Sequence, residues 1–126
     1  MDTNLSLMIR EMEEYAEINN VPIMQKEGIE FLTTFIIKNQ IEKVLEVGTA
    51  IGYSAIKMAL TNPNLKVVTI ERDEERYLEA LKNIKKFNLE DRITLIFSDA
   101  LDVVLDGEFD LIFLDGAKGK NIEFLE

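Results

Sequence analysis

Short, continuously apolar runs alternate with helical segments along this chain, and this alternation restricts it to few folds. The runs at 44–47, 66–70, 92–97 and 109–114 are rich in β-branched and aromatic residues. They lack the apolar–polar alternation of strands with one face in water. Runs of this kind are typical of a parallel sheet covered on both faces. The sequence therefore predicts an α/β fold in which a parallel sheet is flanked by helices.

Helical periodicity accounts for most of the remaining chain. Helices are predicted at residues 4–19, 26–39, 53–60, 73–87 and 101–105, with the first turns of another at 120–126. The first two make an N-terminal helical segment of residues 1–40. With 126 residues the chain has the length of one domain, so 1–126 is treated as a single unit.

Composition excludes several kinds of chemistry. The chain has no cysteine and no histidine, which removes thiolate zinc sites, cysteine nucleophiles and histidine-based triads. Its net charge of −10 disfavours nonspecific binding of nucleic acid or an anionic membrane by this chain alone. No apolar run approaches the roughly 20 residues of a bilayer span. We expect a cytoplasmic protein with no membrane partner.

The residues that follow the strands are the candidates for chemistry. In an open α/β sheet the ligand lies beyond the carboxyl ends of the strands. Each of the four predicted strand ends carries a carboxylate, at Glu46, Glu71, Asp99 and Asp115. Four such ends around a glycine-containing loop favour a binding site over a chance arrangement of polar strand ends.

The glycine loop, residues 48–52, narrows the choice of ligand. It lacks the third glycine of a dinucleotide fingerprint, because Tyr53 stands there, and it lacks the lysine of a P-loop. Glu46 precedes the loop and would repel a pyrophosphate, whereas it would attract a cation such as S-adenosylmethionine, which carries an ammonium and a sulfonium. Glu71 lies where an acid commonly binds ribose hydroxyls. Asp99 is placed to accept a hydrogen bond from the adenine amino group.

Four motifs then make the chain resemble a known family. They are EVGTAIGYSA (46–55), TIER (69–72), SDAL (98–101) and FDLIFLDGAK (109–118). Together they resemble class I S-adenosylmethionine-dependent methyltransferases with a Rossmann-like fold, and among these the divalent-metal O-methyltransferases of the catechol and caffeoyl-CoA type. VPIM (21–24), combined with the glycine loop, is similar to a bacterial subgroup that methylates 5-hydroxyuridine in tRNA. The resemblance extends over residues 10–126.

The resemblance implies a set of cofactor contacts. Met24 lies against S-adenosylmethionine, and Gly48 permits the close approach of the cofactor. Ser54, at the start of the following helix, holds the carboxylate end of its methionine. Asp99 and Ala100 border the adenine.

The resemblance also implies the reacting groups. Asp115 matches the family's first metal ligand and faces the cofactor as well. Lys118 matches the lysine that helps deprotonate the acceptor hydroxyl. Mg²⁺ or a similar cation would lower the pKa of that hydroxyl and fix its position. The acceptor is a hydroxyl of a tRNA nucleoside or of a small molecule, and the full-length form is expected to be a homodimer.

The family pattern continues beyond what this chain encodes. The family sheet has seven strands, and its other two metal ligands are an Asp-Asn pair after the fifth. Only four strands are predicted here, so we expect a fold truncated after the fourth strand, which lacks the full metal and acceptor site and has its outer edge free for self-association.

Two other functions stay open at this point. One is an NAD-dependent oxidoreductase on the same kind of sheet, and the other is a non-catalytic binding or assembly module. Two residues within or near the motifs have structural interpretations: Asp110 lies at a strand start, away from ligands, and Tyr53 packs or lines a cleft instead of reacting.

Overall fold

The computed structural model describes residues 3–99, 108–115 and 122–125. Its elements are α1 (Thr3–Ile18), α2 (Lys26–Lys38), β1 (Lys43–Val47), α3 (Tyr53–Ala59), β2 (Lys66–Glu71), α4 (Glu74–Lys86), β3 (Ile93–Phe97), β4 (Leu111–Asp115) and β5 (Ile122–Leu125). The four helices confirm the predictions for those segments to within a few residues. The predicted helix at 101–105 lies outside the described residues.

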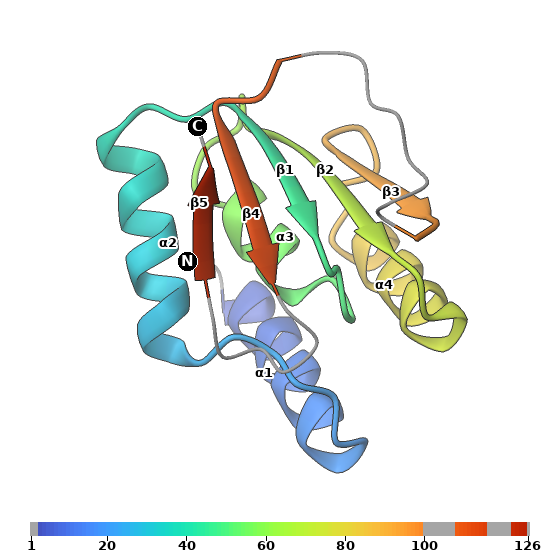
Figure 1. The fold of residues 1–126 in the computed structure, drawn as a ribbon. Helices are drawn as coiled ribbons and strands as arrows, with labels where there is room; N and C mark the ends of the chain where they lie inside the picture. Colours follow the sequence, from blue (N-terminus) through green and yellow to red (C-terminus); the bar gives the residue numbers. More distant parts are fainter. Residues whose placement is uncertain (1–2, 100–107, 116–121, 126) are drawn as a thin grey trace.

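The strands form one sheet in the order β3-β2-β1-β4-β5 (Figure 1). β1 pairs in parallel with both β2 and β4, and β2 pairs in parallel with β3. The chain therefore winds outward from β1 to β3 and then returns to the other side of β1 to form β4. This reversal lies between β1 and β4, and in open α/β sheets ligands bind beyond the carboxyl ends of the strands at such a point.

The end of the chain differs from its prediction. Residues Ile122–Leu125 form β5, which pairs antiparallel with β4, so the helix expected at 120–126 is wrong over these residues. The free edge expected for β4 is wrong for the same reason. An unpaired strand edge presents a row of backbone donors and acceptors. In the described structure, the run Ile-Glu-Phe-Leu of β5 pairs with the backbone of β4 at this edge.

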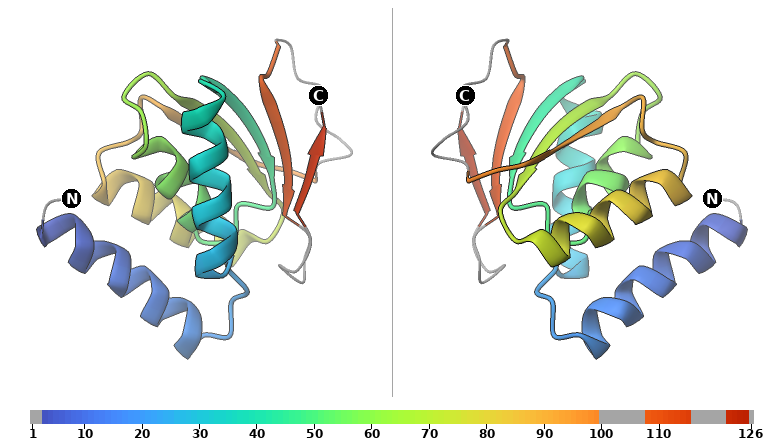
Figure 2. Two further views of the ribbon diagram at one scale, coloured as in Figure 1. Left: turned by 90° about the vertical axis from the view of Figure 1, so that its left-hand side faces the viewer. Right: turned by 90° about the vertical axis from the view of Figure 1, so that its right-hand side faces the viewer.

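The hydrophobic core lies between the sheet and the helices. In Figure 2 the four described helices all lie on one side of the sheet. The largest fully buried apolar side chains come from both layers: Leu32 and Ile36 of α2, Ile51 of the loop, Ile56 and Met58 of α3, Val44, Val67 and Phe113 of the strands, and Leu65 and Ile84.

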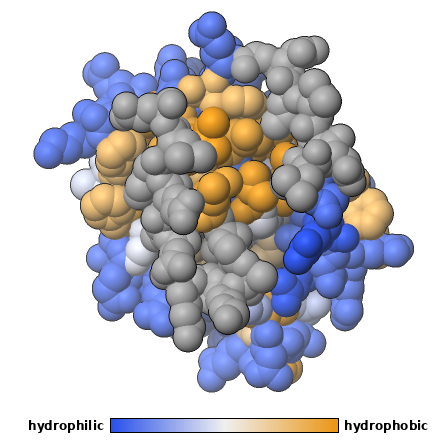
Figure 3. All heavy atoms as spheres, in the orientation of Figure 1, coloured by the Kyte–Doolittle hydropathy of each residue, from blue (hydrophilic) through white to orange (hydrophobic). Residues whose placement is uncertain are grey.

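The opposite face of the sheet is less covered. Leu45, Val68 and Ile112 share this face by register, and each is only partly buried. Figure 3 shows apolar residues gathered in the middle of this face. The described helices therefore flank the parallel sheet on one face, and the other face carries partly buried apolar side chains.

Helix α4 is the one whose ends the sequence marks most clearly. The Asp73 carboxylate caps its first turn by accepting from the backbone N–H of Arg76 at 2.9 Å. Glu74 and Glu75 follow in that turn, and Lys85 and Lys86 lie in the last. Both groups of charges complement the helix dipole.

Asp110 ties the start of β4 to the start of β1. Its Oδ2 accepts from the backbone N–H groups of Glu42 at 3.0 Å and Lys43 at 3.1 Å. This agrees with the structural interpretation of Asp110. Replacing Asp110 by alanine should lower the free energy of unfolding by about 1 kcal/mol, because two backbone donors lose their acceptor. Urea unfolding measures this. Replacing the exposed Asp91 by alanine is the control, and an equal loss there would contradict the assignment.

Candidate functional site

The glycine loop connects β1 to α3 at the carboxyl edge of the sheet. Three of its residues have left-handed backbones, with φ of 99° at Gly48, 51° at Ala50 and 90° at Gly52. Gly52 precedes the first residue of α3, and its backbone conformation is one that residues other than glycine rarely adopt. The loop starts against β2, because the N–H groups of Gly48 and Thr49 both donate to the Ile70 carbonyl, at 2.9 and 3.2 Å.

Glu71 ends β2 directly beside this loop. One of its carboxylate oxygens accepts from the Ala50 N–H at 2.7 Å, and the other accepts from the Asp73 N–H at 3.0 Å. Its side chain is largely buried. The structure therefore brings the predicted ribose carboxylate into contact with the glycine loop.

Glu46 and Ser54 are also brought together, beneath the loop. The Glu46 side chain is fully buried on the helix-facing side of β1. Its Oε1 accepts from the Thr69 hydroxyl at 2.7 Å, and its Oε2 accepts from the Ser54 hydroxyl. Glu46, predicted to favour a cationic ligand, and Ser54, predicted to hold the carboxylate end of a methionine, are thus hydrogen-bonded to each other here.

Asp99 and Asp115 lie along the same edge. Ser98 donates its N–H to the Glu71 carbonyl at 3.0 Å, so the end of β3, where Asp99 follows, is fixed to the end of β2. Asp115 is the last residue of β4. Ala100 and Lys118 lie outside the described residues. Among the residues that the structure describes, no three acidic side chains gather as a metal site.

Met24 is buried and lines a pocket of about 480 Å³. Tyr53, Ile29 and Lys57 line the same pocket, which lies between the N-terminal segment and α3. A smaller pocket of about 190 Å³ lies between Ile51 of the glycine loop and α1. The first pocket is thus lined by residues of α3, and the second is lined by a residue of the glycine loop.

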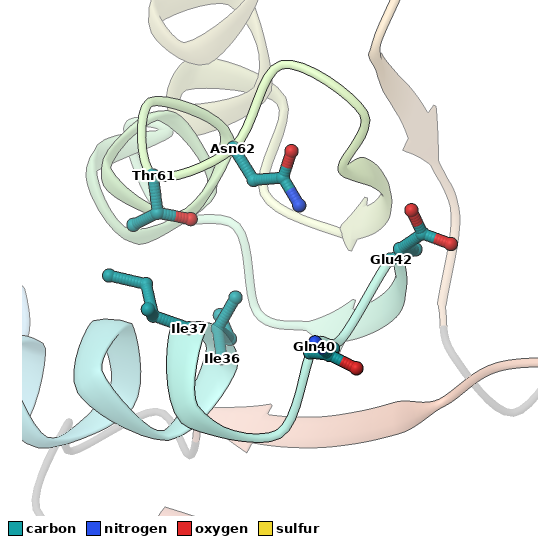
Figure 4. A pocket seen from close by; sticks show the side chains of 6 residues that line it. All are labelled: Ile36, Ile37, Gln40, Glu42, Thr61 and Asn62. Atoms are coloured by element: carbon teal, nitrogen blue, oxygen red, sulfur yellow. The ribbon is translucent and has the colours of Figure 1, made fainter.

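A third pocket, of about 380 Å³, lies at the opposite edge of the sheet. Figure 4 shows it between the end of α2 and the turn before β2, with Ile36 and Ile37 on one side and Thr61 and Asn62 on the other. None of the predicted site residues lines it.

Tyr53 is buried, and its hydroxyl donates to Glu13 of α1 at 2.6 Å. This contact supports the prediction that Tyr53 packs instead of reacting. Burial, followed by the bond to Glu13 and the charge of Glu13, raises the pKa of the Tyr53 hydroxyl above its ordinary value of 10.0. The folded protein therefore favours the neutral phenol more strongly than the unfolded chain does.

This raised pKa predicts a loss of stability in alkali. The contribution of Tyr53 is fully present below about pH 10 and is lost as the pH rises further, because only the unfolded chain then ionises easily. Urea unfolding at about pH 8 and about pH 11 should show a smaller alkaline loss for Tyr53→Phe than for the wild type. Burial and the charges of Glu79 and Glu75 also raise the pKa of Tyr15, so the comparison variant Tyr15→Phe should remove a smaller part of the loss than Tyr53→Phe does. Equal losses in wild type and Tyr53→Phe would contradict the assignment.

Sequence reasoning missed three side chains at this site: Thr49, Thr69 and Asn83. All three are buried. Thr69 is two residues before Glu71 on β2, so alternation along the strand placed it on the same face, and that signal was available. Asn83 is a polar residue within the apolar stripe of α4, which is a weaker signal.

None of the described helices combines the length and the hydropathy that crossing a membrane requires.

The O-methyltransferase family matches residues 2–126 of this chain. A catechol O-methyltransferase from Mycobacterium tuberculosis is 30% identical over 115 residues, which cover 88% of this chain and 52% of the relative. A caffeoyl-CoA O-methyltransferase from Stellaria longipes is 32% identical over 105 residues, covering 75% and 44%. The chain thus spans about half the length of these curated relatives.

Solved structures agree. An O-methyltransferase from Bacillus cereus, in complex with S-adenosylhomocysteine, superimposes with a TM-score of 0.77 and 29% identity, over 86% of this chain and 53% of its own. The parallel four-stranded part of the sheet and its helices thus match Rossmann-like methyltransferase structures. The matches do not favour an NAD-dependent oxidoreductase or a non-catalytic module. By sequence and by fold, the chain belongs to the O-methyltransferase family.

Proposed function

We propose that this chain is the cofactor-binding part of an S-adenosylmethionine-dependent O-methyltransferase. One observation carries the proposal: the glycine loop after β1 is hydrogen-bonded to Glu71, the acid that ends the neighbouring strand β2, at the carboxyl edge of the parallel strands. The relative from Bacillus cereus in complex with S-adenosylhomocysteine supports the choice of cofactor.

The residues of this edge fit such a ligand in three respects. Glu71 presents a carboxylate to a ribose diol, and Asp99 follows the neighbouring strand, where an adenine would lie. The loop turns through left-handed backbone, which lets a ligand approach the main chain closely. Acidic residues at this edge favour a cationic ligand over a pyrophosphate.

The transfer itself assigns tasks to residues of this chain. S-adenosylmethionine, when bound, supplies a methyl group on a positively charged sulfur. The acceptor oxygen bonds to that methyl carbon as the carbon–sulfur bond breaks, and the hydroxyl proton passes to a base. We assign the base to Lys118, and we assign the positioning of the cofactor to Met24, Gly48, Ser54 and Ala100 together with the acids above.

A divalent cation such as Mg²⁺ enters the proposal only through Asp115. The described residues do not assemble a metal site, and Asp115 would be one ligand of such a cation. Loss of transfer by the whole protein after chelation, with recovery on adding Mg²⁺, would support this part.

The acceptor is proposed to carry an activatable hydroxyl. The names of the relatives, catechol and caffeoyl-CoA O-methyltransferases, favour a small aromatic acceptor. The VPIM motif favours 5-hydroxyuridine in tRNA. Incubation of the whole protein with methyl-labelled S-adenosylmethionine and each acceptor separates the two, because label enters either catechol or tRNA. A homodimer of the whole protein is a further proposal, which sedimentation tests.

A thermal-shift comparison tests the choice of cofactor. S-adenosylhomocysteine should raise the melting temperature of this chain, because a ligand that binds only the folded state stabilises it. NADH at the same concentration should leave it unchanged. A rise with NADH and none with S-adenosylhomocysteine would overturn the proposal in favour of the oxidoreductase.

A further inference from the structure

We propose that Thr69 and Asn83 are positioning residues that hold the glycine loop in its ligand-ready shape before any ligand arrives. The inference rests on the proposed function, in which this loop receives the cofactor. Neither side chain needs to contact that cofactor. One is anchored in β2 and the other in α4, the two elements that lie beside the loop in Figure 1.

Thr69 anchors the beginning of the loop through a chain of hydroxyl groups. Its hydroxyl donates to Glu46 Oε1 at 2.7 Å, and its oxygen lies 2.6 Å from the hydroxyl oxygen of Thr49 in the loop. A hydroxyl has one proton to donate. Since the Thr69 proton is directed at Glu46, the proton in the second bond comes from Thr49. The bonds therefore run in one direction, from loop to β2 to β1.

The same buried carboxylate also reaches the helix that follows the loop. The Ser54 hydroxyl, in the first turn of α3, donates to the other oxygen of Glu46. Glu46, Thr69 and Thr49 have at most 1% of their surface exposed, and Ser54 has 4%. Water therefore cannot readily replace a lost partner, so removing the Thr69 hydroxyl takes one buried hydrogen bond from Glu46 and one from Thr49.

Asn83 anchors the far end of the loop. Its side-chain amide donates to the backbone carbonyl of Ile51 at 2.9 Å, across 32 residues of sequence. Asn83 lies in the stripe of α4 that faces the core, with Ala80 and Ile84 as buried neighbours, and it is itself only 6% exposed. The one amide side chain among these buried residues of α4 is thus hydrogen-bonded to the backbone of the glycine loop.

Between Thr49 and Ile51 the backbone of the loop adopts an unfavourable conformation. Ala50 has a φ of 51°, a left-handed conformation that alanine rarely adopts, and it lies between the two anchored residues Thr49 and Ile51. Its N–H donates to Glu71. Because the loop is held at both ends, Ala50 stays in place against Glu71 of β2. A loop that is ordered before binding loses less conformational entropy when a ligand binds.

The test uses four variants of the whole chain. Thr69→Val removes the hydroxyl at nearly constant shape, and Thr69→Ser restores it. Asn83→Leu removes the amide donor at similar volume. Val67→Ala is the matched control: Val67 is buried on the same face of the same strand but has no side-chain hydrogen-bonding group, so its truncation removes apolar packing alone. Urea unfolding first shows under which conditions each variant is folded.

Two readouts follow on the folded variants. The first is hydrogen exchange of the Ala50 amide without ligand, and the second is the dissociation constant for S-adenosylhomocysteine. Thr69→Val and Asn83→Leu should each speed Ala50 exchange and weaken binding about tenfold. Thr69→Ser should stay within about threefold of wild type in both. Val67→Ala should lower global stability and leave the affinity unchanged.

The outcomes separate the two proposals. Unchanged Ala50 exchange in Thr69→Val and Asn83→Leu would overturn the positioning roles, whatever the ligand. Faster exchange with unchanged affinity would overturn them as well, because the loop shape would then not matter for binding. If exchange responds as expected but the folded wild type does not bind S-adenosylhomocysteine, the positioning of the loop stands and the proposed function fails.

Discussion

Replacing Glu71 by alanine is expected to weaken S-adenosylhomocysteine binding about a hundredfold, the largest effect of any single substitution at the site. Hydrogen bonds to a charged group contribute about 1.5–3 kcal/mol each, and a ribose offers two hydroxyls to this carboxylate. The substitution also removes the acceptor of the hydrogen bonds that the Ala50 and Asp73 N–H groups donate to Glu71. Isothermal titration of the folded variant measures the change.

Two further variants make this result specific. Glu71→Gln keeps the size and one good acceptor, so its affinity should lie between those of wild type and Glu71→Ala. Glu74→Ala removes an exposed carboxylate in the first turn of α4, three residues along the chain, and should leave the affinity unchanged. If Glu71→Ala binds the ligand as well as Glu74→Ala does, Glu71 is not a cofactor residue.

Replacing Phe113 by alanine is expected to have the largest effect on stability. Phe113 is fully buried in β4 and pairs in register with Glu46 of β1. Truncating a buried phenylalanine costs about 3–5 kcal/mol, because the transfer free energy is lost and a cavity remains. Urea unfolding should show this loss, and for a small domain it removes much of the total stability.

Phe97 provides the control for that substitution. It lies in β3 with half its surface exposed and stacks obliquely on Tyr77 of α4 at a centroid distance of 5.1 Å. Phe97→Ala should cost about 1 kcal/mol. Equal losses at the two positions would mean that the core does not lie between β4 and the helices.

Periodicity and strand ends predicted the local elements well. Helix α4 carries its own boundary signals, with the Asp73 cap and oppositely charged ends, and it forms where expected. The four parallel strands likewise appear within a few residues of the predicted runs. Each of these signals is local, so the sequence expresses it directly.

The features that sequence reasoning missed depend on contacts between distant segments. The run Ile-Glu-Phe-Leu at 122–125 reads equally well as helix or strand, and its pairing with β4 decides between them. Thr69 and Asn83 look like ordinary strand and helix residues until the fold places Glu46 and Ile51 beside them. The site's carboxylates were found because they end strands. Thr69 and Asn83 were missed because their hydrogen bonds join segments that are distant in the sequence.

The central claim is that the edge formed by the glycine loop and Glu71 binds S-adenosylmethionine or its product. A titration of the isotope-labelled chain with S-adenosylhomocysteine, followed by amide nuclear magnetic resonance, tests it most directly and detects even weak binding. The account predicts saturable shifts at Gly48–Gly52, Glu71 and Asp99, and none at the distant pocket lined by Gln40 and Asn62. A folded chain whose loop amides do not shift at millimolar ligand, or shift equally with NADH, would contradict it.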